Sequence, residues 1–308
     1  MNLLQAPRSV VMIRPHAFCS NPETQGDNAF QTATHEDVSQ MARDEFDTAV
    51  RTLRNHGVDV NVFEDFGTRH TPDSVFPNNW FSTHAGGHVA LFPMFAKNRQ
   101  RERRSDVIDM LKRDFRVSDV IDYSGLEHDG LALEGTGAMV LDHIGRIAFV
   151  AKSNRADPVV LERFCTHFNY EPIAFDAQDT SGQAIYHTNV LMGIGTGFAM
   201  VGLGLIPDRE RRQTVVDRLV ETGREVIDLT AEQIESFAGN AIELTGHSRI
   251  LALSSRALDV LRPDQINIIE RSATPVPLSI PTLENAGGSV RCMIAGIHLT
   301  RRPERKAA

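Results

Sequence analysis

The stretch from Leu131 to Lys152 reads LALEGTGAMVLDHIGRIAFVAK and holds two short apolar segments, Leu131–Leu141 and Arg146–Lys152, separated by a turn. Short apolar segments of this kind are typical of buried β-strands. An amphipathic helix is predicted next, near Pro158–Phe168, because proline suits a first helical turn. A further strand is predicted near Pro172–Asp176. This region therefore predicts a strand–strand–helix–strand unit.

The same order of elements recurs along the chain, which indicates an internal repeat. Three more units share it: Val75–Phe81, His88–Met94, Glu102–Phe115 and Val117–Tyr123; Tyr186–Gly193, Phe198–Leu203, Asp208–Thr222 and Glu225–Leu229; Ala241–Thr245, Arg249–Leu253, Ala257–Glu270 and Pro275–Ile280. A fifth unit begins at the C-terminus with Val290–Leu299, and its missing parts stand at the N-terminus: Val10–Ile13, Glu36–Asn55 and Val58–Phe63. We therefore expect residues 1–308 to form one α/β domain, a fivefold pseudosymmetric propeller, with a disordered polar tail at residues 301–308.

Five polar residues fall at similar places in the five units. They are Asn79, Glu134, His187, Asn240 and Cys292, separated by 55, 53, 53 and 52 residues. In a closed ring of such units, equivalent strand positions face one axis, so these side chains are expected to converge on a central site. Asn240 is identified by spacing alone, whereas the other four residues are also indicated by their chemistry.

Composition excludes several classes of protein. The chain is 41% hydrophobic and 23% charged, close to the average of globular domains. Its net charge of −8 argues against a nucleic-acid partner. We find no signal peptide and no apolar run approaching the ~20 residues of a membrane helix. The three cysteines, Cys19, Cys165 and Cys292, have no paired spacing, so we predict no disulfide, no zinc site and a cytoplasmic location.

Three other features are interpreted as structural. The basic run of Lys97, Arg99, Arg101, Arg103 and Arg104 is read as a solvated helix face. The glycine-rich segment 193–197 lacks the spacing of a dinucleotide loop and is read as a hairpin turn. A glycine pair between His84 and His88 likewise indicates a turn, not a metal site, so no metal and no cofactor are predicted.

Cysteine, histidine and a carboxylate are the side chains that carry chemistry here. Cys292 follows a Gly287-Gly288 pair, which allows tight turns near a ligand, whereas Cys165 lies on the apolar side of a predicted helix. His187 and Asn189 alternate at the start of a strand and so share a face. Glu134 would be costly in an apolar segment unless it were paired, and His187 is a natural partner. The three match the pattern of a nucleophile, a base and an orienting acid.

The order of these motifs resembles that of a known superfamily. An acid-Gly-x-Gly at Glu134, His-x-Asn at His187 and Gly-Gly-x-x-x-Cys ending at Cys292 are similar to motifs of arginine deiminases, dimethylarginine hydrolases, agmatine deiminases and amidinotransferases. The resemblance implies the fivefold propeller called the pentein fold. It also implies that Cys292 is the nucleophile, His187 the general acid–base and Glu134 its orienting carboxylate.

Two positions depart from the deiminase pattern. Where that family has Asp after the Phe of its first motif and in His-x-Asp, this chain has Asn78-Asn79 and Asn189. Carboxylates suit a cationic guanidinium, whereas carboxamides suit a neutral ureido group, because they offer both a donor and an acceptor. We therefore expect Asn79, Asn189 and Asn78 to bind the ureido group of citrulline, as in the citrulline ureidases that the chain resembles. The alternative is that Asp73 or Asp129 supplies the missing charge for a guanidino substrate.

The predicted reaction converts citrulline to ornithine, ammonia and carbon dioxide through a covalent Cys292 intermediate. The polar N-terminal stretch 14–24 is either a solvated loop or a substrate cover in which Arg14 holds the α-carboxylate. Other functions stay open: an arginine-deiminase-like, dimethylarginine or succinylarginine hydrolase, an amidinotransferase, or a non-catalytic amino-acid-binding protein. A small amino acid is the expected partner, with no membrane or nucleic acid, and a homodimer is an open alternative.

Overall fold

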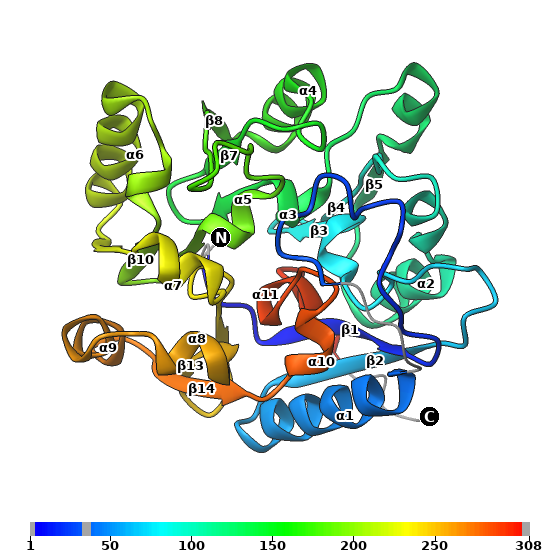
Figure 1. Ribbon diagram of the computed structural model, residues 1–308. Helices are drawn as coiled ribbons and strands as arrows, with labels where there is room; N and C mark the ends of the chain where they lie inside the picture. Colours follow the sequence, from blue (N-terminus) through cyan, green and yellow to red (C-terminus); the bar gives the residue numbers. More distant parts are fainter. Residues whose placement is uncertain (1–3, 33–37, 304–308) are drawn as a thin grey trace.

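Five three-stranded sheets surround a central axis in the computed structural model, which describes residues 4–32 and 38–303 (Figure 1). The predicted fivefold α/β propeller is confirmed. The last strand of the chain, β15 (Ala295–Ile297), pairs with β1 (Ser9–Pro15) near the N-terminus. The two ends of the chain therefore complete one unit, as the repeat predicts.

Every sheet has the same topology. An inner strand pairs antiparallel with a middle strand, and the middle strand pairs parallel with an outer strand. The inner strands are β3 (Phe81–His84), β6 (Val140–Asp142), β9 (Met192–Ile194), β12 (Ile242–Thr245) and β15. The middle strands are β4 (His88–Leu91), β7 (Ile147–Ala151), β10 (Phe198–Val201), β13 (Arg249–Ser254) and β1. The outer strands are β5 (Asp119–Asp122), β8 (Glu171–Phe175), β11 (Glu225–Asp228), β14 (Thr274–Leu278) and β2 (Asp59–Asp65).

The longer helices join each middle strand to its outer strand and form a ring around the sheets (Figure 1). They are α1 (Ser39–Asn55), α2 (Ser105–Asp114), α4 (Pro158–Phe168), α6 (Arg209–Glu221) and the pair α8 (Ser255–Asp259) and α9 (Pro263–Glu270). Helix α4 begins where the sequence predicts, because Asp157 accepts hydrogen bonds from the backbone of Val159 (2.9 Å) and Val160 (3.2 Å) and Pro158 occupies the first turn. Each helix packs its buried apolar face against the sheets and covers them.

Short helical turns precede the inner strands, and here the structure differs from the sequence prediction. The turns are η1 (Pro77–Asn79), α3 (Gly135–Ala138), α5 (Thr188–Leu191) and α11 (Val290–Met293). The sequence predicts continuous strands through all four. The apolar pattern does not separate the two conformations, since every residue of the first three turns is buried on all sides. As a result, the candidate site residues lie on or beside helical turns and not on strands.

The remaining turns complete the connections. They are η2 (Arg99–Glu102), η3 (Ser124–Asp129), η4 (Leu203–Leu205), α7 (Ala231–Glu235) and α10 (Pro281–Glu284). Both glycine-rich segments read as turns do join hairpin strands, β3 to β4 and β9 to β10. Arg301 and Arg302, assigned to a disordered tail, instead pair with the end of α2, through a bridge to Phe115 and a 2.8 Å bond from Arg302 N to Asp114 O. Residues 304–308 lie outside the described residues.

Candidate active site

Cys292 lies on α11 at the axis and is only 2% exposed. Its Sγ accepts hydrogen bonds from two carboxamides, Asn189 Nδ2 and Asn240 Nδ2, each at 3.2 Å. The Asn240 Oδ1 atom accepts from the backbone nitrogens of Arg291 (3.0 Å) and Cys292 (3.4 Å). One side chain therefore fixes both the sulfur and the turn that carries it. Asn240, which spacing alone predicts as an axial residue, therefore contacts Cys292 directly.

We expect Asn240→Ala to lower kcat/KM by about 10- to 100-fold, because it removes a donor to the sulfur and the side-chain oxygen that holds the turn bearing Cys292. Alkylation of Cys292 by iodoacetamide should slow in parallel, as measured by mass spectrometry of the labelled peptide. Gln233→Ala, which alters a buried carboxamide bonded to Val260 O at α7, is the matched control for general destabilisation. Equal losses in both variants would remove Asn240 from the site.

His187 and Glu134 form a buried pair. His187 Nε2 lies 2.8 Å from Glu134 Oε2, and the two side chains are 2% and 0% exposed. Burial lowers the pKa of His187 to about 4, although the hydrogen bond and charge of Glu134 act in the opposite sense. Burial would raise the pKa of Glu134, but the charge of Arg155, the His187 bond and Arg99 together hold it well below its usual range. Glu134 is thus ionised and His187 neutral at pH 7, with Nε2–H donating to the carboxylate and Nδ1 free as a base.

Gly137 on α3 explains why His187 and Asn79 come so close to this turn. A Cβ at Gly137 would clash with the carboxamide of Asn79 and lie 3.0 Å from the His187 ring. No residue with a side chain fits between them without displacing one or the other. The Gly-x-Gly of the motif at Glu134 therefore serves the packing of two candidate site residues.

Two buried arginines flank Glu134, and the sequence analysis missed both. Arg99 Nη1 lies 3.6 Å and Arg155 Nη1 3.5 Å from Glu134 Oε2. The reading of residues 97–104 as a solvated helix face is wrong for Arg99, which is 2% exposed and bonded to Glu102 at 2.8 Å. The carboxylates of this cluster compensate the guanidinium charge, which a basic run in a sequence cannot reveal.

The repeat did contain a signal for these arginines. Arg99 follows Asn79 by 20 residues, and Arg155 follows Glu134 by 21, so the two occupy equivalent places in neighbouring units. Both come just after the middle strand region of their unit. The equivalent spacing of two charged residues in neighbouring units is therefore the sequence signal that indicates this pair.

The structure separates the other predicted binding residues into two groups. With its carboxamide oxygen toward Arg99, Asn79 accepts from both terminal nitrogens at 3.0 Å and donates to Asn78 Oδ1 at 3.2 Å. Asn78 is fully buried, and its Nδ2 atom has no partner among the described residues. Arg14 is not brought to these residues, because its guanidinium pairs with Asp47 (2.7 Å) and Glu64 (2.8 Å).

Asp73 and Asp129, the two alternative sources of negative charge, also differ in position. Asp129 is exposed at the end of η3. Asp73 is buried 3.7 Å from Arg99 Nε, and its Oδ2 accepts a hydrogen bond from Asn21 at 2.7 Å. The Asp73 Oδ1 atom has no partner among the described residues. Of these two carboxylates, only Asp73 therefore lies in the buried cluster around Arg99.

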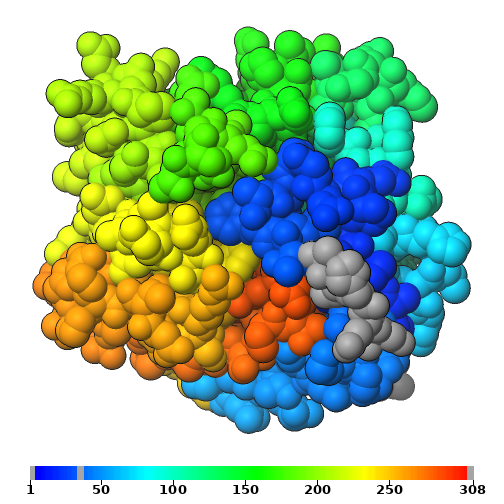
Figure 2. All heavy atoms as spheres, in the orientation of Figure 1, coloured from blue at the N-terminus to red at the C-terminus, as the bar shows by residue number. Residues whose placement is uncertain are grey.

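The N-terminal segment 16–32 lies across the centre of the face that bears the short turns (Figure 2, dark blue). Asp27 forms a bidentate ion pair with Arg155, which includes a 2.9 Å bond from Arg155 Nε. Asn28 Nδ2 donates to Ala286 O at 3.3 Å, beside the glycine pair that precedes Cys292. The segment thus lies over the candidate site, although Arg14, predicted to hold a substrate carboxylate from this stretch, is turned to Asp47 and Glu64.

The other two cysteines do not share this setting. Cys165 is buried in the core around α4, and burial raises the pKa of its thiol to about 12, so it is unreactive at neutral pH. Cys19 is exposed on the N-terminal segment. In residues 4–32 and 38–303, no three His, Cys, Asp or Glu side chains gather closely enough to hold a metal ion. No helix in the same ranges is long and apolar enough to cross a membrane.

A fivefold propeller with a buried cysteine, histidine and glutamate at one end of its axis defines a class of protein, the pentein enzymes that modify guanidino groups. The chain matches the family model for N,N-dimethylarginine dimethylhydrolase of the eukaryotic type over residues 14–299. It therefore belongs to that family, whose members are C–N hydrolases. No curated protein sequence matches the chain.

Solved structures show the same fold at low sequence identity. The N-terminal domain of ArgZ, an arginine dihydrolase of the ornithine–ammonia cycle in cyanobacteria, is 16% identical with a TM-score of 0.71, covering 94% of this chain and 99% of that one. Unliganded AgrE is 16% identical with a TM-score of 0.73, covering 96% of this chain and 40% of that one. The Pseudomonas aeruginosa dimethylarginine hydrolase with citrulline is 12% identical with a TM-score of 0.62, covering 96% and 100%. At these identities the likeness establishes the fold alone.

Proposed function

We propose that the protein hydrolyses the ureido group of citrulline, giving ornithine, ammonia and carbon dioxide. The observation that carries the proposal is the pair of neutral carboxamides, Asn189 and Asn240, on the Cys292 sulfur. Asn189 Oδ1 has no partner among the described residues and is available to accept a ureido N–H. A neutral ligand suits neutral amides, whereas a cation would need a carboxylate that these positions do not provide.

Charge near Asn79 supports the same choice. The first position at which the deiminases have Asp is here a carboxamide facing the guanidinium of Arg99 at 3.0 Å. A substrate guanidinium entering beside Arg99 would be repelled by a second buried positive charge. Glu134 does not offset this, since its charge already compensates Arg155 and Arg99.

The mechanism follows from the protonation states. Cys292 attacks the ureido carbon while its thiol proton passes to neutral His187, forming a tetrahedral adduct. His187 then gives that proton to the departing δ-nitrogen, so that ornithine leaves and a carbamoyl thioester of Cys292 remains. His187 next removes a proton from water, which attacks the carbamoyl carbon and releases the thiol and carbamic acid. Carbamic acid decomposes to ammonia and carbon dioxide, so the overall reaction consumes one water.

The amino-acid end of the substrate also has candidate partners. Asp27 places a carboxylate against Arg155 from the covering segment, and a substrate α-carboxylate of the same chemistry would replace it there. The exchange keeps the buried guanidinium paired, which limits its cost. Movement of segment 16–32 would then accompany substrate entry.

A second candidate is hydrolysis of a guanidino group, with arginine or a methylated arginine as substrate. The family match favours it, and so does the unpartnered Oδ1 of buried Asp73, which would accept a hydrogen bond from a cation. In that reaction Cys292 attacks the guanidino carbon, an amine leaves, and water releases a ureido product. ArgZ, which has the same fold, is an arginine dihydrolase.

A substrate panel tests the proposal. We expect purified protein to release equimolar ornithine and ammonia from L-citrulline, with kcat/KM at least about 100-fold above that for L-arginine or dimethylarginine, because discrimination by buried polar groups is large. Products are measured by chromatography, with added glycine to detect amidino transfer. Citrulline formed from arginine or dimethylarginine would favour the second candidate. Binding of citrulline by calorimetry without any product would indicate a binding protein.

A further inference from the structure

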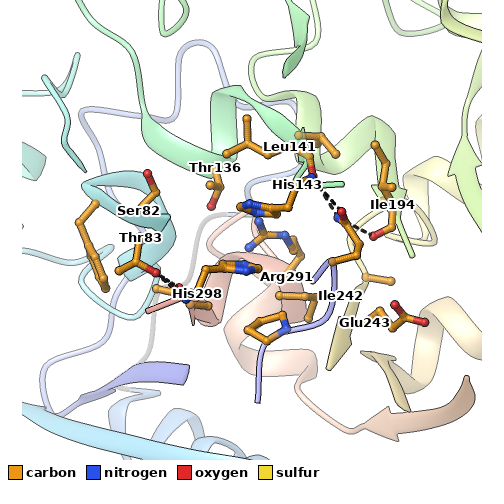
Figure 3. A pocket seen from close by; sticks show the side chains of 18 residues that line it. Ser82, Thr83, Thr136, Leu141, His143, Ile194, Ile242, Glu243, Arg291 and His298 are labelled. Atoms are coloured by element: carbon orange, nitrogen blue, oxygen red, sulfur yellow. Dashed lines mark hydrogen bonds between the residues drawn. The ribbon is translucent and has the colours of Figure 1, made fainter. Parts of the chain in front are cut away.

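A cavity of about 40 Å³ lies on the axis behind α11. Inner strands of all five units line it (Figure 3), and the N-terminal residues Gln5 and Pro7 line it as well. Gln5 is fixed there, since its Nε2 donates to Leu141 O (3.0 Å) and Ile194 O (3.3 Å) and its Oε1 accepts from His143 N (2.9 Å). The residues proposed for citrulline hydrolysis do not line this cavity.

The cavity contains a positive charge without a partner. Arg291 extends into it, and its guanidinium makes one 3.1 Å bond, to Ile294 O of its own turn (Figure 3). Among the described residues, no carboxylate lies within ion-pair distance of Arg291. The three buried arginines differ in this respect: Arg99, Arg155 and Arg224 each pair with a carboxylate. Loss of solvent lowers the pKa of Arg291 to about 10, so the guanidinium is still charged at pH 7.

Glu243 also lines the cavity but does not compensate Arg291. Its Oε2 accepts a 2.8 Å bond from Thr196 N and another from the Thr196 hydroxyl. Burial raises the pKa of Glu243, although Thr196, Arg249 and Arg224 act in the opposite sense, and its Oε1 atom has no partner among the described residues. The neutral carboxamide of Gln5 and the aliphatic walls add no negative charge. A guanidinium that faces a cavity without a carboxylate partner is costly to remove from water unless something enters the cavity to pair with it.

We propose that this axial cavity binds a small monovalent anion, of the size of chloride or formate, against the guanidinium of Arg291. A single water needs about 10–15 Å³ of such a volume, so the cavity accommodates a halide or a three-atom carboxylate and excludes an amino acid. Because Arg291 precedes Cys292, an anion here weakens the positive potential at the nucleophile. The cavity thereby influences the catalytic thiol without contacting the substrate.

The approach to the cavity is positive as well. A groove of about 430 Å³ shares Pro7, His143 and His298 with it and opens at the surface. Arg8, Arg146 and Arg301 also line this groove, and no Asp or Glu does. In a chain of net charge −8, such a mouth concentrates anions locally. The His143 and His298 rings stack at 3.8 Å between the groove and the cavity, and burial lowers the pKa of both, so they stay neutral.

The test is anion-dependent stability at constant ionic strength, with gluconate as the reference salt. Replacing gluconate by chloride or formate at pH 7.5 should raise the Tm of the wild type by about 2 °C or more and reach saturation, as binding to the native state requires. Arg291→Met, which keeps the length of the side chain, should abolish the saturable rise. Arg301→Met, at the surface mouth, should retain it. Persistence of the rise in Arg291→Met, or no saturable rise in the wild type, overturns the proposal.

Anomalous diffraction from wild-type crystals soaked in bromide provides a test that does not depend on the folding of a variant. The expected result is a bromide peak within hydrogen-bonding distance of the Arg291 guanidinium. Bromide found only at Arg99 or Arg155, or absent from the cavity, overturns the proposal and leaves the citrulline reaction unaffected.

Discussion

Cys292→Ser is expected to reduce citrulline turnover by about ten-thousand-fold or more, because a hydroxyl held by two carboxamides is a far weaker nucleophile than a thiol. The carboxamide contacts of Asn189 and Asn240 can persist with serine, so the fold and the site geometry are retained. The measurement is ornithine release under saturating citrulline. In the wild type, rapid quenching followed by mass spectrometry should detect a carbamoyl group on the peptide that contains residue 292.

The other two cysteines supply matched controls. Cys19→Ser changes an exposed thiol and should leave kcat within twofold of wild type, as most surface substitutions do. Cys165→Ser disturbs a buried core position, so it should lower the Tm more than it lowers kcat. Turnover by Cys292→Ser within tenfold of wild type would eliminate the covalent mechanism, whatever the substrate.

The second large effect is expected from Glu134→Gln. This change keeps the shape of the side chain but removes the charge that offsets Arg155 and Arg99 and accepts the hydrogen bond of His187. We expect kcat to fall by about 100- to 1000-fold, because His187 then loses the partner that orients it as acid and base. Arg155 keeps Asp27 and Arg99 keeps Glu102, so the variant should still fold.

Glu134→Gln should also change the pH dependence of kcat. Burial lowers the pKa of His187 to about 4 even though the hydrogen bond and charge of Glu134 raise it. Loss of the carboxylate therefore moves the His187 pKa further down, and the acidic limb of the kcat profile should shift to lower pH. Glu102→Gln is the control, since it neutralises another buried carboxylate of the cluster that pairs with Arg99 and has no bond to His187. An equal loss of kcat and an equal pH shift in both variants would mean that Glu134 acts only through its negative charge, and not through its hydrogen bond to His187.

The sequence determined the architecture because five repeats of one apolar pattern have few ways to bury their strands. Chemistry pointed to Asn79, Glu134, His187 and Cys292, and spacing added Asn240. The structure joins four of these residues by direct contact, Glu134 with His187 and Asn240 with Cys292. Motif order also led to the right superfamily. These predictions rest on the apolar pattern within each unit and on the recurrence of that unit along the chain. Both can be observed in the sequence without knowing which residues are in contact.

Only the tertiary structure decided what surrounds those residues. It turned the starts of four predicted strands into helical turns, buried Arg99 within a run that looked solvated, and directed Arg14 to Asp47 and Glu64. It also left Arg291 facing a cavity without a carboxylate. The physical reason is common to these cases: the partner of a charge, and whether water reaches it, depend on segments far away in the chain. A sequence states which side chains carry charge, and the packing of five units decides which of those charges are paired.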